Sequence, residues 1–89
     1  MGKRIKTGHL DVWIAASPFA YARVGIVVPK HKRSAVDRNR LRRRLRELVR
    51  VRMLPVIPSC DVLIRSLPRA YEAPFDLLSV EVERVVNRV

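Results

Sequence analysis

Cysteine, glycine and long apolar runs are all scarce in this sequence of 89 residues. The single cysteine, Cys60, excludes an internal disulfide, and we expect it to be a small buried residue in a reducing cytoplasm. No apolar run approaches the roughly 20 residues of a membrane span, and no charged-then-apolar signal segment opens the chain. We therefore expect a cytoplasmic protein with no membrane partner.

The sequence also lacks residues spaced as in a catalytic or metal site. The three glycines form no phosphate-binding loop, and His9 and His31 share no metal-ligand spacing with Cys60 or the carboxylates. We interpret His9, a lone histidine at a strand edge, as a surface residue rather than a base or a metal ligand. The aspartates are scattered, which disfavours a two-carboxylate nuclease site. The sequence predicts a chain that binds, with no metal site and no catalytic residue of its own.

Acidic residues number only 8 against 19 lysines and arginines, so the formal net charge is +11. An excess of this size points to nucleic acid first, and then to anionic membranes or acidic proteins. The hydrophobic content of 48% is enough for one core but not for two. Residues 1–89 are therefore expected to form a single domain.

Residues 34–53 predict an arginine-rich helix. Leu41, Leu45, Leu48 and Val49 recur at helical spacing, and Ser34 is a candidate N-cap. The remaining positions are nearly all arginine, and like charges one turn apart repel each other. Because an ordinary solvated face mixes both signs, this surface predicts a polyanionic partner. Together with the basic loop before the helix, the candidate nucleic-acid-binding residues are Lys30, Lys32, Arg33, Arg38, Asn39, Arg40, Arg42, Arg43, Arg46 and Arg50.

Three stretches predict strands. In residues 10–14 the aliphatic side chains Leu10, Val12 and Ile14 alternate with Asp11 and Trp13, the period-2 pattern of a strand with one face on a core. Residues 23–28 are continuous and β-branched, as in a central strand covered on both faces. Residues 60–65 predict a third strand. A Ser-Pro turn is expected to join the first two strands as antiparallel neighbours, and the arginine-rich helix joins the second and third in a β-α-β unit.

The two ends of the chain differ in pattern. Residues 1–7 show no apolar periodicity and are expected to form an extended or mobile basic lead-in. Residues 66–74 predict a loop. Residues 75–89 repeat apolar side chains at helical spacing, which predicts an amphipathic closing helix with Glu81 and Glu83 away from its apolar stripe.

Residues 33–47 resemble the signature of the protein subunit of bacterial ribonuclease P. The matching pairs are Ala35-Val36, Arg38-Asn39, Arg42-Arg43 and Arg46-Glu47. The strands on either side and the closing helix are also similar to the family, so the resemblance covers about the whole chain. One departure is that family members usually begin with a further helix carrying an aromatic pair. Here Gly2-Lys3-Arg4 stands about where that helix should already have ended, so the helix is expected to be missing from this sequence.

The resemblance implies an α+β fold, a two-layer α/β sandwich similar to domain two of ribosomal protein S5. Its β-α-β crossover would be left-handed, which the sequence pattern alone does not favour. In such a subunit the arginine-rich helix docks on the catalytic RNA, and a cleft on the sheet receives the 5′ leader of precursor tRNA. Lys30 and Arg69 are then placed to reach the leader, and Trp13 and Tyr21 are candidates to stack on it. The resemblance further implies that the RNA, with Mg²⁺, performs the hydrolysis, so the protein holds no cofactor and no small-molecule substrate.

Three other interpretations use the same features. A ribosomal or other structured-RNA-binding protein would use the cationic face without any processing role. A DNA-reading helix of the zipper type lacks the leucine heptads that should follow Met53. A membrane-active helix would bind lipid through its apolar stripe, but the same stripe is needed to pack against the strands.

Overall fold

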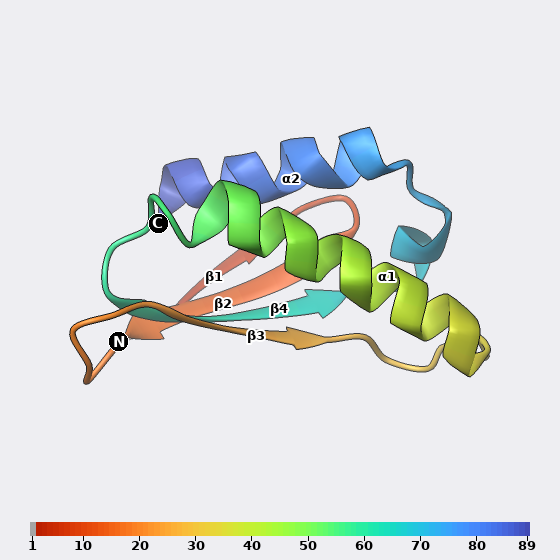
Figure 1. The fold of residues 1–89 in the computed structure, drawn as a ribbon, viewed down its shortest axis with the longest axis horizontal. Helices are drawn as coiled ribbons and strands as arrows, with labels where there is room; N and C mark the ends of the chain where they lie inside the picture. The colour runs from red at the N-terminus through yellow and green to blue at the C-terminus, as the bar shows by residue number, and fades with distance from the viewer. Residues whose placement is uncertain (1) are drawn as a thin grey trace.

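The computed structural model describes residues 2–89 as two layers, a four-stranded sheet and two helices that lie side by side on one face of it (Figure 1). The strands are β1 (Lys3–Lys6), β2 (Leu10–Ala16), β3 (Arg23–Val27) and β4 (Cys60–Ser66). The helices are α1 (Ala35–Leu48) and α2 (Phe75–Arg88), with a π-helical segment η1 (Val49–Met53) and a 3₁₀ turn η2 (Pro68–Glu72). The predicted two-layer α/β sandwich is confirmed. None of the helices formed by residues 2–89 has the length and apolar character of a membrane span.

The strand order is β1-β2-β4-β3, so β4 lies between β2 and β3. β4 pairs antiparallel with β2 and parallel with β3. The prediction that residues 10–14 and 23–28 are antiparallel neighbours is therefore wrong, because β4 takes that place. The prediction of a central strand at residues 23–28 is also wrong, because β3 is an edge strand. The continuous apolar run of β3 does not indicate a strand covered on both faces, because Gly25 and Val27 face the uncovered side of the sheet.

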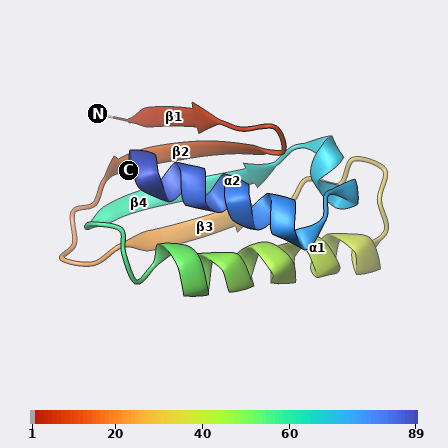
Figure 2. The ribbon, with the colours of Figure 1, turned by 90° about the horizontal axis from the view of Figure 1, so that it is seen from above.

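The β3-α1-β4 unit has an unusual hand. Figure 2 looks at the helix-covered face with β3 and β4 both running to the right, and β4 lies above β3. A right-handed crossover would place β4 below β3, so this crossover is left-handed. The structure thus agrees with the family resemblance and departs from the general preference of such units.

The core lies between the sheet and the two helices. β2 contributes its predicted inward residues, α1 contributes its leucine stripe, and α2 contributes Leu78, Val82 and Val85. Cys60 is buried, as expected. Burial of each large aliphatic side chain contributes roughly 1.5–3 kcal/mol, which is how the highly charged α1 stays docked on the sheet. The buried aliphatic residues of β2 and α1 are Leu10, Val12, Ile14, Leu41, Leu45 and Leu48.

The first residues are extended, which is one of the two states expected of the lead-in, and they form a strand that the sequence did not predict. Lys3–Lys6 forms β1, the other edge strand, and Ile5 is buried opposite Val12 of β2. Met1 lies outside the described residues. One buried residue in a strand of four gives no periodicity, so the sequence pattern carried no signal for it.

The helix predicted over residues 34–53 begins where it was expected and changes its winding near its end. The Ser34 hydroxyl accepts a hydrogen bond from the backbone N–H of Asp37 at 3.1 Å, which confirms the N-cap. Towards its other end the expected helix changes to the wider π-helical winding of η1, which buries Val49 and Met53. The predicted loop at 66–74 contains η2.

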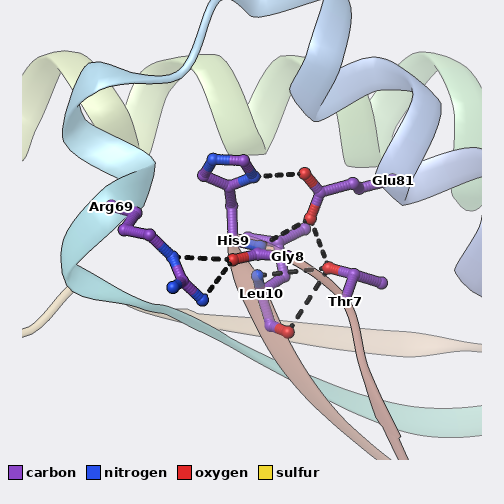
Figure 3. A network of polar contacts seen from close by, with 6 residues as sticks. All are labelled: Thr7, Gly8, His9, Leu10, Arg69 and Glu81. Atoms are coloured by element: carbon purple, nitrogen blue, oxygen red, sulfur yellow. Dashed lines mark hydrogen bonds and ion pairs between the residues drawn. The ribbon is translucent and has the colours of Figure 1, made fainter.

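Glu81 of α2 is buried and holds the turn between β1 and β2, as Figure 3 shows. Its carboxylate accepts hydrogen bonds from the Thr7 hydroxyl and from the backbone N–H of His9, the latter at 2.8 Å. The carboxylate also contacts Nδ1 of the His9 ring. The expected place of Glu81 on the polar side of the closing helix is therefore wrong. The expected surface role of His9 is wrong as well, because its half-buried ring belongs to this cluster.

Candidate nucleic-acid interface

The outward face of α1 is a concentrated cationic surface. Its exposed residues include Asn39, Arg40, Arg43 and Arg46, while Arg38, Arg42 and Arg44 are half-buried. A hollow of about 410 Å³ lies among Val36, Asn39, Arg40, Arg43 and Arg44. The leucine stripe faces the core, and this is what turns the arginines towards solvent.

Most of these arginines form no ion pair with a carboxylate of the described residues. Arg50 pairs with Glu47 at 2.6 Å, which lowers the pKa of Glu47, and Arg33 pairs with Glu72 at 2.9 Å. Within residues 2–89, no carboxylate forms an ion pair with Arg40, Arg43 or Arg46. These three guanidinium groups remain available to an anionic ligand.

The basic loop before α1 has a constrained backbone. His31 and Lys32 take left-handed conformations, with φ of 43° and 62°, which non-glycine residues rarely adopt. Tyr71 of η2 fixes this loop, because its hydroxyl donates to the carbonyl oxygen of Pro29 at 2.7 Å. The guanidinium of Arg33 lies over the Tyr71 ring at 5.1 Å. Tyr71 is thus a positioning residue, although its place in a predicted loop gave no sign of this role.

A second hollow lies where α1 meets η2. It has a volume of about 150 Å³ and is lined by Arg33, Asp37, Arg40, Leu41, Arg44 and Tyr71. Three guanidinium groups around so small a hollow suit a compact anion such as a phosphate group, although the Asp37 carboxylate opposes it.

The face of the sheet away from the helices carries a different, largely apolar hollow. Along β4 the even-numbered residues are buried in the core, so Leu63 and Arg65 point to the open side. The hollow there has a volume of about 580 Å³ and is lined by Trp13, Val27, Pro29, Leu63 and Arg65. It combines an aromatic ring, aliphatic walls and one cation, which suits an unstacked base with its phosphate.

One edge of this open face is held by a bidentate ion pair. The Arg4 guanidinium donates to both carboxylate oxygens of Asp11, at 2.8 and 2.6 Å, and lies over the Trp13 ring at 5.2 Å. The hydrogen bond from Arg4 lowers the pKa of Asp11, although Asp11 is buried. The Trp13 ring is thereby held beside a fixed positive charge.

The four residues predicted to reach a leader strand do not meet in one place. Trp13 lines the hollow of the open face, and Lys30 directly follows Pro29 at its rim. Arg69 instead donates two hydrogen bonds to the carbonyl oxygen of Gly8, at 3.2 and 2.9 Å (Figure 3). Tyr21 lies in the loop between β2 and β3, stacked on Phe19.

Val27, Leu63 and Arg65 are site residues that the sequence pattern did not predict. The signal was present in β4, since alternation of the core residues Val62 and Ile64 implies that Leu63 and Arg65 face the other side. No group of three potential metal ligands from His, Cys, Asp and Glu occurs within residues 2–89.

Comparisons with known proteins agree with this fold. A family model described as Ribonuclease P matches residues 1–89. The ribonuclease P protein component of Acidothermus cellulolyticus is 32% identical over 90 residues, covering 99% of this chain and 75% of that protein. The component of Syntrophobacter fumaroxidans is 37% identical over 70 residues, covering 78% of this chain and 59% of that protein. The solved RNase P protein of Thermotoga maritima superposes with a TM-score of 0.87 at 23% identity, covering 99% of this chain and 84% of that one.

Proposed function

Because the chain belongs to the Ribonuclease P protein family, we propose that it is the RNA-binding protein subunit of ribonuclease P. In this role it assists removal of the 5′ leader from precursor tRNA. The observation that carries the proposal is the cationic face of α1, where the family signature coincides with guanidinium groups that no carboxylate neutralises within residues 2–89.

The cationic face and the basic loop bind the ribonuclease P RNA. Each arginine that contacts a phosphate releases condensed counterions, so the affinity comes largely from this release and falls with added salt. The constrained loop at His31 and Lys32 brings Lys30 and Arg33 to the same end of the molecule as the start of α1. Loop and helix then form one continuous docking surface.

The open face of the sheet receives the single-stranded leader. Trp13 offers a ring for stacking, Leu63 and Val27 offer aliphatic contacts, and Arg65 offers a cation for the backbone. Lys30 follows Pro29, which lines this hollow, and it begins the basic loop before α1, so it can serve either ligand. Arg69 contributes indirectly, by holding the turn at Gly8.

The RNA performs the phosphodiester hydrolysis with Mg²⁺, and this chain supplies no catalytic residue. Its contribution is to lower the repulsion between two polyanions and to hold the precursor in place, which converts a loose encounter into an oriented complex. We place the assembled enzyme in the cytoplasm.

Cleavage of a precursor tRNA by a bacterial ribonuclease P RNA at low, near-physiological Mg²⁺ tests this function. Adding the protein should strongly stimulate cleavage at the leader junction. A protein in which Arg40, Arg43 and Arg46 are all changed to alanine should bind the RNA weakly and stimulate little. Tight RNA binding without stimulated cleavage would instead support a structured-RNA-binding protein without a processing role.

A further inference from the structure

A second cationic hollow lies on the other side of the sheet from α1. It has a volume of about 370 Å³ and lies between β1 and the last turns of α2. Figure 2 shows that α2 crosses the sheet so that its C-terminal end lies towards β1, whereas α1 lies along the β3 side. The molecule therefore carries basic surfaces at two opposite edges of the sheet. The residues that line this second hollow are Ile5, Lys6, Thr7, Arg84, Asn87 and Arg88.

α2 turns two guanidinium groups to this hollow. Arg84 and Arg88 follow Glu81 at helical spacing, so they share the side of α2 that faces the turn between β1 and β2. Both are exposed, and no carboxylate of residues 2–89 forms an ion pair with either of them. Glu81 itself is buried and already accepts hydrogen bonds from Thr7 and His9. The two positive charges can therefore pair with an external anion.

The end of α2 is adapted to an anion by a lysine of β1. The C-terminal end of a helix carries a partial negative charge, which by itself would repel an anion. Lys3 offsets this charge, because its ammonium group donates a hydrogen bond to the backbone carbonyl oxygen of Arg88. Asn87 adds a side-chain amide that can donate to a phosphate oxygen. Guanidinium and amide donors in one hollow suit the phosphate groups of a nucleic acid backbone.

The side of α2 that faces the first helix separates the two basic surfaces. There Glu83 pairs with Arg52 of η1 at 2.9 Å, which neutralises both charges. Val80, one helical turn before Glu83, is 44% exposed and offers a strand of phosphates no favourable contact. A polyanion running from α1 across this band to the second hollow would lose electrostatic attraction on the way. The two surfaces therefore suit two separate backbone segments.

We propose that the hollow between β1 and α2 binds backbone phosphates of a second segment of the ribonuclease P RNA. The proposal rests on the proposed function and adds to it a contact site separate from α1. The occupant is the RNA of the enzyme rather than the precursor, because this hollow borders the helical layer, whereas the proposed leader site lies on the opposite face of the sheet. Contacts at two edges fix the orientation of the protein on the RNA, which a single patch leaves less constrained.

The salt dependence of binding to ribonuclease P RNA tests this site. A protein carrying both Arg84→Gln and Arg88→Gln loses two charges and keeps polar side chains of good helix propensity. We expect the slope of log affinity against log salt to fall by about two, and the affinity at physiological salt to fall about 10- to 30-fold. Arg52→Gln is the matched control, because Arg52 already pairs with Glu83, and it should change neither quantity. Adding Arg43→Ala to the double variant should add its own loss in log affinity, because separate contacts act independently.

The outcomes distinguish this site from the proposed function. An unchanged slope in the double variant would overturn the site, even if the protein strongly stimulates cleavage of precursor tRNA. A reduced slope without stimulated cleavage would support the site and reject the proposed function. A loss that appears only when precursor tRNA is present would also overturn the site, because the precursor would then be its occupant.

Directed cleavage of the bound RNA tests whether two segments are held. Cys60 is buried, so the cysteine introduced by Asn87→Cys or by Val36→Cys on α1 is the accessible thiol for a tethered iron chelate. Hydroxyl radicals generated at the two positions should cut two sets of nucleotides that do not overlap, and unchanged protein treated with the same reagent gives the background. Overlapping sets would overturn the proposal of a second segment. Cutting from position 36 without cutting from position 87 would overturn it as well.

Discussion

The backbone N–H of His9 donates to Oε1 of Glu81 at 2.8 Å, across 72 residues of sequence. The same carboxylate accepts from the Thr7 hydroxyl and contacts the His9 ring, so one buried group fixes the turn between β1 and β2 on α2. Burial raises the pKa of Glu81, and the hydrogen bonds from Thr7 and His9 together outweigh it. The pKa of Glu81 therefore lies below its ordinary value.

Changing Glu81→Leu should lower the free energy of unfolding by about 2–3 kcal/mol, because it leaves buried donors at Thr7 and His9 without an acceptor. Urea unfolding followed by circular dichroism measures the loss. The matched control is Glu83→Gln on the same helix, where the carboxylate is half-exposed and pairs with Arg52. The control should change stability by less than about 0.5 kcal/mol. Equal effects of both substitutions would exclude Glu81 as the group that holds the turn.

Acid should destabilise the protein chiefly through two buried carboxylates. The pKa values of Glu81 and Asp11 are both lowered in the folded state, from ordinary values of 4.5 and 3.8. The unfolded chain therefore takes up protons first, and the stability these groups provide is lost as the pH falls below about 4.5. Unfolding free energies measured from pH 6 to pH 3 should decline, and the decline should be shallower in Glu81→Gln. A decline of the same steepness in that variant would contradict the assignment.

Single substitutions on the cationic face should weaken RNA binding in a salt-dependent way. Arg43→Ala or Arg46→Ala removes one unneutralised charge, and each should reduce the slope of log affinity against log salt by about one. Arg52→Ala serves as the control, because Arg52 already pairs with Glu83 at 2.9 Å. Binding is measured by filter retention of ribonuclease P RNA at several salt concentrations. Unchanged slopes for Arg43→Ala and Arg46→Ala would remove this face from the interface.

Multivalent anions should stabilise the free protein. A net charge of +11 makes the folded state repel itself, and an anion bound between arginines relieves this repulsion. The small hollow lined by Arg33, Arg40 and Arg44 is the best candidate to hold a sulfate ion. The Tm should rise more in sodium sulfate than in sodium chloride of equal ionic strength, and Arg44→Ala should reduce the difference. Identical Tm values in the two salts would count against anion binding.

Local sequence patterns by themselves determine much of the fold. The leucine stripe and the Ser34 cap specify α1, and alternation specifies the inward faces of β2 and β4, because helix and strand periodicities depend only on neighbouring residues. The concentration of arginine on one face likewise follows from those periodicities. The family signature lies on this helix, so the sequence alone was sufficient to identify the cationic surface.

Only the tertiary structure decided how distant segments meet. The insertion of β4 between β2 and β3, the left-handed crossover, and the burial of Glu81 under the β1–β2 turn all depend on contacts between residues far apart in sequence. The open face of the sheet is decided in the same way, because both helices pack on the opposite side. The sequence by itself therefore determined which side chains are cationic and which are apolar. The order of the strands decided that Trp13, Leu63 and Val27 would share one hollow.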